Sequence, residues 1–208
     1  MANLALLLTL SCLLASTLNA DARKQTPSVV EEEESFLREI GGGKVKLAKL
    51  HLYVQDLRIG HKNATVVEVA KAEGVTDNSP YKFGSVHVLD DLVTEGPGIN
   101  SRPVGRIQGL TTNADLSTFG IAMNLNFVFT TGKIAGSTLS ILGRNQVKDD
   151  ARELPVAGGT GVFRYARGYA IQTTYSMDFA TQYAVLEYTI YTTYSYGINE
   201  DDVEVMEM

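Results

Sequence analysis

The sequence predicts an all-β fold, and three observations favour it. From Lys44 onward β-branched and aromatic residues dominate, clusters of Gly, Pro, Asn and Asp separate these runs, and no amphipathic helix pattern interrupts them. Eight strands at such short spacing are typical of an antiparallel barrel or a sandwich, and side-chain alternation does not distinguish the two. The expected strands cover residues 44–58, 63–72, 83–90, 103–112, 119–130, 136–143, 160–175 and 182–194.

The two ends of the chain differ in composition from the middle. Residues 1–22 are predicted to be a secretory signal peptide, because Ala5–Ser16 is a short apolar run that small residues follow. We expect residues 23–43 to be a flexible acidic arm and residues 199–208 to be a disordered acidic tail. The folded domain is then residues 44–198, and the protein is expected in the extracellular space.

Composition and motifs argue against several function classes. The expected domain holds 13 acidic and 15 basic residues without a basic stripe, so nucleic-acid binding is not indicated. The first apolar run is too short to cross a membrane, and no later apolar run approaches the necessary length. His51, His61 and His87 lack metal-site spacing, and no glycine-rich segment fits a nucleotide-binding pattern, so we expect neither a metal nor a cofactor. The serine-hydrolase pattern GxSxG is also absent from the sequence.

Secretion leads to two further expectations. The sequence has a single cysteine, Cys12, which lies within the predicted signal peptide. The mature protein is therefore expected to be stabilised by core burial and assembly, because it has no cysteine for a disulfide. Asn63-Ala64-Thr65 is an acceptor sequence for N-glycosylation, which matters only in a secreted chain. We therefore expect a glycan on Asn63.

Five segments resemble the plant dirigent family and occur in the family's order. They are HLYVQD (51–56), VLDDLVTEGP (88–97), VGRIQGL (104–110), MNLNFVFTTGK…GSTLS (123–140) and GRN with RELPVAGGTGVFRYARGYA (143–170). The resemblance covers roughly Lys46 to Tyr194, which is the whole expected domain. It implies an eight-stranded antiparallel barrel, and so favours the barrel over the sandwich. It also implies that three copies pack as a homotrimer.

The resemblance further implies a function. Dirigent proteins bind phenoxy radicals that a separate laccase or peroxidase makes, and they fix which faces couple. We therefore expect a protein of the apoplast that directs stereoselective coupling of monolignol radicals, such as those of coniferyl alcohol, to lignan-type products. It would not be an enzyme with a redox centre of its own. One alternative is a dirigent-fold dehydratase that acts on an isoflavanol through a quinone methide. The other is a defence or cell-wall protein without turnover.

Asp56 is the candidate catalytic residue. Leu50, Leu52 and Val54 share one face of the first expected strand, and Asp56 is next in that row. Spacing leaves two alternatives, an exposed strand end or a carboxyl group inside the barrel. The resemblance implies the second, with Asp56 acting on quinone methide-like intermediates, and it places Tyr53 in the same element as a substrate-binding candidate. Burial would then favour the neutral, proton-donating form of Asp56.

Four further residues are candidates for substrate binding. Asp90 lies with Asp91 at the start of an expected loop, where capping a turn is the simpler alternative and the resemblance implies a pocket mouth. Arg144 and Arg152 flank an expected polar connector, and Arg152 matches an arginine that lies near the pocket in lignan-forming members. For both arginines, surface solubility is the alternative. Asn145 stands where lignan-forming relatives carry an aspartate, so one expected acid is missing.

Tyrosines are concentrated in the last part of the chain, where eight of the ten follow residue 160. Over the expected strand 160–175, alternation places Tyr165, Tyr169 and Tyr175 on one face with Phe163 and Arg167. Two alternatives stay open for this face. The rings pack in the core or against a neighbouring copy, or they form flat pocket walls for an aromatic substrate.

Overall fold

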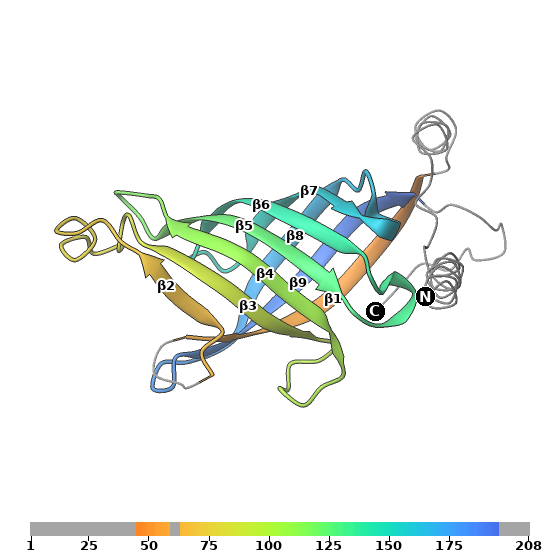
Figure 1. The fold of residues 1–208 in the computed structure, drawn as a ribbon, viewed down its shortest axis with the longest axis horizontal. Coiled ribbons are helices and arrows are strands. Elements are labelled where there is room, and N and C mark those ends of the chain that lie inside the picture. Colours follow the sequence, from red (N-terminus) through yellow and green to blue (C-terminus); the bar gives the residue numbers. More distant parts are fainter. Residues whose placement is uncertain (1–44, 59–62, 196–208) are drawn as a thin grey trace, which may run out of the picture. The chain divides into compact units, whose positions relative to one another are not determined.

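The structure is a computed structural model that describes residues 45–58 and 63–195. The predicted signal peptide, acidic arm and acidic tail lie outside the described residues and stay predictions. Within these two ranges the chain forms nine strands and two short 3-10 helices (Figure 1). Neither of the described helices is long and apolar enough to cross a membrane. The elements are β1 (Val45–Leu57), β2 (Val66–Ala70), β3 (Val86–Thr94), β4 (Pro103–Asn113), β5 (Gly120–Phe129), η1 (Gly132–Ile134), β6 (Thr138–Gln146), β7 (Arg152–Thr160), η2 (Gly161–Phe163), β8 (Gly168–Asp178) and β9 (Tyr183–Ser195).

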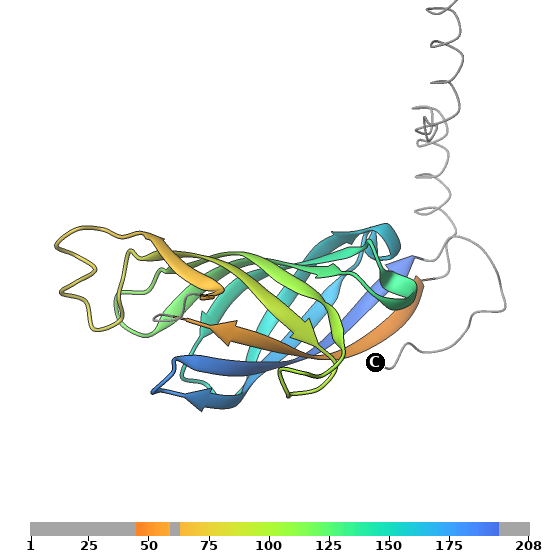
Figure 2. The same ribbon diagram turned by 60° about the horizontal axis from the view of Figure 1, so that its bottom comes forward.

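Eight of these strands close into an antiparallel barrel. Neighbouring strands follow the order β1-β9-β8-β7-β6-β5-β4-β3, and β1 also pairs with β3, which closes the ring. β2 is added along the edge of β3. The two ribbon views show the strands tilted around a common axis (Figure 1 and Figure 2). Because the ring is closed, its inward-facing side chains share one lumen, and the predicted barrel is confirmed.

The expected polar connector between residues 143 and 160 contains a strand of the barrel, which corrects the sequence prediction. In β7, Arg152, Leu154 and Val156 are buried, while Glu153 and Pro155 between them are exposed. Charged and proline residues on the outward face concealed the alternation. The eight expected strands therefore included β2, which lies outside the ring, and omitted β7, which belongs to it.

The expected strand after residue 160 is also interrupted. η2 occupies its first residues, and β8 begins only after a further turn. Phe163 is completely buried, whereas Tyr165 has a φ of 62° and is exposed, so the two do not share a strand face. Tyr169 is exposed and its ring centroid lies 5.2 Å from that of Tyr191 on β9. The prediction of one continuous aromatic face is therefore wrong.

Lumen-facing side chains fill one half of the barrel. Leu50 and Leu52 of β1 are completely buried, as is Phe127 of β5. The rings of Phe127 and Tyr188 meet edge to face with centroids 5.3 Å apart. Burying a large apolar side chain stabilises a fold by roughly 1.5–3 kcal/mol, so this half provides the rigid core. Its other large members are Phe129, Leu139, Ile141, Leu154, Phe163 and Ile190.

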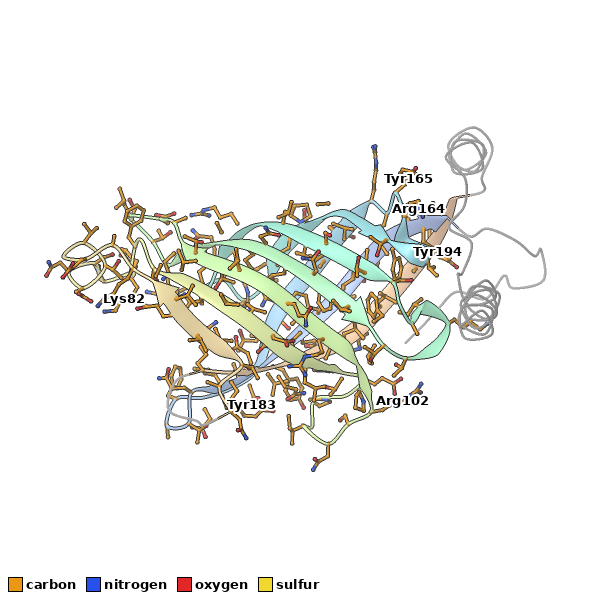
Figure 3. The ribbon with its side chains drawn as sticks, viewed as in Figure 1. Lys82, Arg102, Arg164, Tyr165, Tyr183 and Tyr194 are labelled. Carbon is orange, nitrogen blue, oxygen red and sulfur yellow. The ribbon has the colours of Figure 1, made fainter. Side chains whose placement is uncertain are left out.

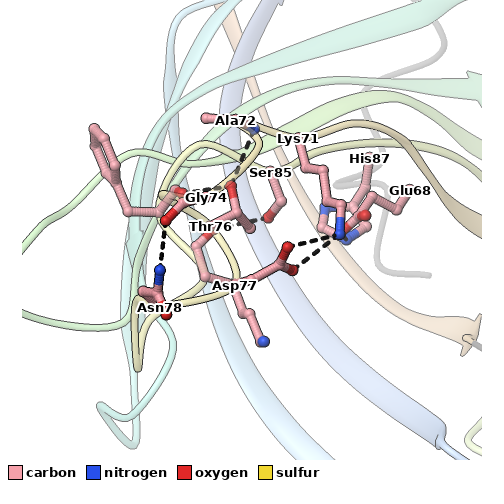
Figure 4. A network of polar contacts seen from close by, with 11 residues as sticks. Glu68, Lys71, Ala72, Gly74, Thr76, Asp77, Asn78, Ser85 and His87 are labelled. Carbon is pink, nitrogen blue, oxygen red and sulfur yellow. Dashed lines mark hydrogen bonds and ion pairs between the residues drawn. The ribbon is translucent and has the colours of Figure 1, made fainter.

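The connection between β2 and β3 is held by its own hydrogen bonds (Figure 4). Lys71 Nζ donates to Asp77 Oδ1 at 2.9 Å, and the hydroxyl group of Thr76 donates to the carbonyl oxygen of Phe83 at 2.8 Å. The side-chain amide of Asn113, on β4, donates to the carbonyl oxygen of Tyr81 at 2.8 Å. These contacts fix the connection against the barrel without adding side chains to the cavity described below.

Candidate functional site

The other half of the lumen holds a cavity of about 480 Å³. Every strand of the ring contributes to its lining, because inward-facing residues recur at every second position. The cavity lies toward the end of the barrel near Tyr183 and away from Tyr194 (Figure 3). Binding sites for small molecules measure about 300–1,000 Å³, so this volume suits one. The apolar lining consists of Val54, Leu89, Ile107, Phe119, Ile121, Met123, Leu125, Val147, Met177, Phe179, Ala184 and Leu186.

β3 changes its partner at the cavity. β1 pairs with β3 as far as Gln55↔Leu92, and beyond that point β2 pairs with β3 instead. The next residues on β1 and β3 are Asp56 and Asp91. Both belong to the inward-facing rows of their strands, so both carboxyl groups line the cavity beside the point where β1 and β3 separate, near enough for the charge of Asp56 to act on Asp91. The topology therefore places an acid pair in the wall of the cavity.

Asp56 is buried and ion-paired. Only 3% of the residue is exposed, and both of its carboxylate oxygens accept hydrogen bonds from Arg58. The Nε of Arg58 lies 3.0 Å from Oδ1, and Nη2 lies 3.1 Å from Oδ2. A guanidinium group in this two-pronged geometry is a strong partner for a carboxylate. Burial alone would favour a neutral Asp56, as the sequence led us to expect, and the structure adds Arg58 as a cation bound to both carboxylate oxygens.

Asp91 is equally buried but differently surrounded. It is 2% exposed, and its Oδ1 has no hydrogen-bond partner within the described residues. Burial, followed by the nearby charge of Asp56, raises the pKa of Asp91 to about 7. The hydroxyl group of Thr65 and the cation of Arg58 oppose this rise. Near neutral pH, Asp91 is therefore the member of the pair that can hold and release a proton.

A second polar group lines the opposite wall. The side-chain amide of Asn145 donates to Gln172 Oε1 at 2.6 Å. Arg152 donates through Nη1 to the carbonyl oxygen of Asp149 and through Nη2 to the hydroxyl group of Thr174, at 3.0 and 3.1 Å. Burial lowers the pKa of Arg152. Among the described residues, Asn145 Oδ1 and Arg152 Nε have no partner, which leaves one acceptor and one donor for a ligand.

Tyr188 lies between the two polar walls at the floor of the cavity. It is 1% exposed, it packs against Phe127, and it lines the cavity beside Arg152, Asp56 and Asp91. Burial raises the pKa of its hydroxyl group well above the usual range, so Tyr188 stays protonated. The floor is thus an uncharged ring against which an aromatic ligand can pack.

Three of the six predicted site residues line the cavity. They are Asp56, Asn145 and Arg152, which come from β1, β6 and β7. Asp56 and Arg152 lie in opposite walls, and the aspartate-to-asparagine difference at residue 145 falls in the wall that also holds Arg152. The structure therefore brings these three side chains to one cavity, while their roles stay proposals.

The other three predicted residues face away from the cavity, because each lies one position out of the inward row of its strand. Tyr53 donates to Glu187 at 3.3 Å on the outer face of the barrel. Asp90 accepts from Arg106 on that face, and Arg144 donates to Asp115 at 2.6 Å. Tyr53, Asp90 and Arg144 therefore do not line the cavity, and contact between them and a substrate stays a prediction.

Seven polar residues of the cavity were not among the predicted site residues, namely Arg58, Asp91, Thr111, Gln172, Thr174, Gln182 and Tyr188. A signal existed for Asp91, since it continues the inward row of Leu89 and Val93 once β3 is extended through Thr94. Sequence reasoning ended that strand at residue 90. Arg58, Gln172 and Tyr188 carried no comparable signal, because their places depend on distant strands.

Within residues 45–58 and 63–195, no three His, Cys, Asp or Glu side chains gather where they could hold a metal ion. The described polar groups of the cavity are carboxyl, amide, guanidinium, hydroxyl and phenol groups. Such an arrangement can bind oxygen-bearing aromatic molecules and transfer protons to or from them.

Comparison with known proteins agrees with this arrangement. A family model described as dirigent-like protein matches residues 47–193. Dirigent protein 11 of Arabidopsis thaliana is 47% identical over 146 residues, which cover 70% of this chain and 74% of the relative. Pterocarpan synthase 1 of Glycyrrhiza echinata is 40% identical over 153 residues, which cover 73% of this chain and 80% of the relative. The solved structure of a pterocarpan synthase dirigent protein matches with a TM-score of 0.70 and 38% identity, covering 76% of this chain and 96% of that one. The match extends over the whole barrel and its cavity, and the chain therefore belongs to the dirigent-like protein family.

Proposed function

We propose that the protein binds a phenolic alcohol in the barrel cavity and removes water from it through a quinone methide, as a dehydratase acting on an isoflavanol-type substrate. The observation that carries this proposal is the pair of buried carboxyl groups, Asp56 and Asp91. One has a guanidinium partner and the other has a pKa of about 7, so a base and an acid stand together near neutral pH. The relative named pterocarpan synthase supports this reaction class.

The acid pair completes the reaction without any other proton carrier. Asp91 gives its proton to the departing benzylic hydroxyl group, the carbon–oxygen bond breaks, and water leaves a protonated quinone methide, in which the ring hydroxyl group keeps its proton and shares the positive charge. A phenolic hydroxyl group of the same molecule then adds to the exposed carbon, and Asp56 takes the proton that this hydroxyl loses. Proton transfer from Asp56 to Asp91 restores the starting state. The substrate becomes product plus one water, so no oxidant is consumed. General acid–base catalysis of this kind contributes about 100- to 10,000-fold.

The opposite wall holds the aromatic ring in place. A ring hydroxyl group can donate to Asn145 Oδ1, which has no partner within the described residues, while the ring supplies electron density to the carbon that loses the hydroxyl group. Arg152 Nε can donate to a second oxygen of the substrate. Filling two buried groups that otherwise lack a partner contributes about 0.5–1.5 kcal/mol each, which favours one orientation of the ring.

Stereoselective coupling of monolignol radicals is the second candidate. The observation that favours it is the presence of two polar walls, Asp56 with Asp91 and Asn145 with Arg152, separated by an apolar middle. Each wall could hold the phenolic oxygen of one coupling partner, and the apolar walls would then fix which faces meet. This activity requires radicals from a separate laccase or peroxidase in the extracellular space, and it would be carried out by the homotrimer that the resemblance implies.

One pair of incubations separates the two candidates. Purified protein is given a 2′-hydroxyisoflavanol without any oxidant, and ring-closed product is measured by chiral chromatography. In parallel, coniferyl alcohol is oxidised by a fixed amount of a one-electron oxidant with and without the protein. Product in the first incubation supports dehydration. If the coniferyl alcohol incubation gives an enantiomeric excess and the isoflavanol incubation gives no ring-closed product, stereoselective coupling is the supported function and dehydration is not. No effect in either incubation contradicts both.

A further inference from the structure

Arg58 is fixed in place on two sides. Its backbone N–H donates to the carbonyl oxygen of Gln182 at 3.1 Å, in the turn between β8 and β9. β1 ends at Leu57, and the Thr65 N–H donates to the carbonyl oxygen of Leu57 at 2.8 Å. The guanidinium group of Arg58 folds back over the carboxyl group of Asp56, two residues earlier.

Arg58 makes the two carboxyl groups unequal. Both oxygens of Asp56 accept hydrogen bonds from Arg58, and a proton on either oxygen would compete with an N–H that already points at it. Asp91 has no such partner, since its Oδ1 lacks any hydrogen bond within the described residues. Two nearby carboxylates do not both ionise without a cost, so one of them retains a proton near neutral pH.

The other cation near Asp91 is already engaged. Arg106 of β4 donates through Nε to Asp90 Oδ1 and through Nη2 to the carbonyl oxygen of Asp90. It therefore lowers the pKa of Asp91 only as a more distant charge. Arg106 and Asp90 partly neutralise each other on the outer face, and neither distinguishes Asp56 from Asp91 by a direct bond.

Two further titratable groups face the pair. His87 precedes Asp91 in the inward row of β3 and lies 3.8 Å from Glu68, and burial followed by the charge of Arg58 lowers its pKa, so it is neutral near pH 7. Tyr188 stays protonated at the cavity floor. Of the charged groups around the pair, Arg58 is thus the one whose hydrogen bonds select between the carboxyl groups.

We propose that Arg58 is a positioning residue, whose two-pronged bond holds Asp56 as the charged carboxylate and thereby assigns the transferable proton to Asp91. The use of that proton in catalysis rests on the proposed function. The distribution of charge between Asp56 and Asp91 does not rest on the proposed function, because it is a property of the protein without substrate. Arg58 acts through Asp56, and it decides which carboxyl group is the acid and which is the base.

Carbon-13 NMR of the aspartate carboxyl groups tests this proposal in the intact protein without substrate. Asp91→Asn and Asp56→Asn spectra assign the two signals, and both are followed across a pH range centred on about 7. In the wild-type protein the Asp91 signal is expected to move with pH while the Asp56 signal stays flat. In Arg58→Gln the pair shares one proton, so the Asp56 signal is expected to move together with that of Asp91.

Two controls make the result specific. Arg106→Gln removes a cation whose charge also lowers the pKa of Asp91 but which does not bind Asp56, so the Asp56 signal should stay flat. Arg58→Lys keeps the cation, and the signal should stay flat there too. A flat Asp56 signal in folded Arg58→Gln overturns the proposal. Should that variant fail to fold, the wild-type protein decides, because an Asp56 signal that moves in the same range as that of Asp91 overturns it equally. Absence of turnover with every substrate would contradict the proposed function and leave these signals unchanged.

Discussion

Replacing Asp91 by asparagine should stabilise the protein at neutral pH. The carboxyl group has a pKa of about 7 in the folded chain against an ordinary value of 3.8. The folded state therefore binds this proton more tightly than the unfolded state, and ionisation of Asp91 opposes folding progressively as pH rises from about 4 to about 7. That difference corresponds to at most about 4 kcal/mol, reached above pH 7. An asparagine side chain cannot ionise, so Asp91→Asn should gain most of this amount at pH 8 and almost none near pH 4.

The same substitution should abolish most of the dehydratase activity. Asparagine keeps the shape of the side chain but has no transferable proton, so turnover should fall by about 100- to 10,000-fold. In the wild-type protein, turnover should be highest below the pKa of Asp91 and fall about tenfold per pH unit above it, because only the protonated form donates. A substitution that raises stability and lowers activity is typical of a position whose native residue serves catalysis at a cost in stability.

Thermal unfolding from pH 4 to pH 8 and isoflavanol turnover without oxidant measure the two effects. Asp90→Asn is the matched control, because the neighbouring carboxyl group faces outward and is exposed. It should leave turnover unchanged and should not stabilise the protein at pH 8. Full turnover in Asp91→Asn would refute the role of Asp91 as the acid. A lower melting temperature at pH 8 would instead show that burial does not disfavour its charged form.

Four further predictions concern other parts of the molecule. Asp56→Asn should reduce turnover by about 100-fold or more, because the base is lost, while circular dichroism shows an intact barrel; unchanged turnover would remove Asp56 from the mechanism. Phe127→Ala should lower the free energy of unfolding in denaturant by about 3–5 kcal/mol, since Phe127 is completely buried against Tyr188, and a loss under about 1 kcal/mol would contradict its place in the core. Intact mass of protein secreted by plant cells should show cleavage near residues 20–22 and a glycan on Asn63, and an uncleaved intracellular chain would contradict secretion. Light scattering should give about three times the monomer mass, whereas a stable monomer at micromolar concentration would contradict the trimer.

The alternation of neighbouring residues was sufficient to predict the fold class and to single out Asp56 as a candidate site residue. The alternation of Leu50, Leu52, Val54 and Asp56 is a property of consecutive residues, and an extended chain places such residues on one face wherever the strand lies. The spacing thus placed Asp56 in the row of Leu50, Leu52 and Val54, and the resemblance implied that this row ends inside the barrel. Five segments in dirigent order favoured the barrel over the sandwich, which alternation did not separate.

The strand boundaries needed the tertiary structure, because pairing partners lie far away in sequence. β7 is a strand because β6 and β8 bond to it on both sides, although its outward residues include Glu153 and Pro155. β3 continues through Thr94, and within it Asp91 is buried and faces inward while Asp90 is exposed. Neighbouring residues of a strand point to opposite faces, so a difference of one residue decides which aspartate enters the barrel. The predicted candidate, Asp90, is therefore next to the aspartate that lines the cavity, Asp91.

The chemistry of the site was decided by tertiary structure alone. Whether a carboxyl group is an acid or a base depends on its burial and on the charges a few ångströms away, which consecutive residues do not specify. Asp56 and Asp91 line one cavity because β3 exchanges β1 for β2 beside them, and Arg58 reaches Asp56 because it lies just past the end of β1. The sequence by itself determined an all-β chain with an inward aspartate. The closure of eight strands brought a second carboxyl group beside the first and raised its pKa to about 7.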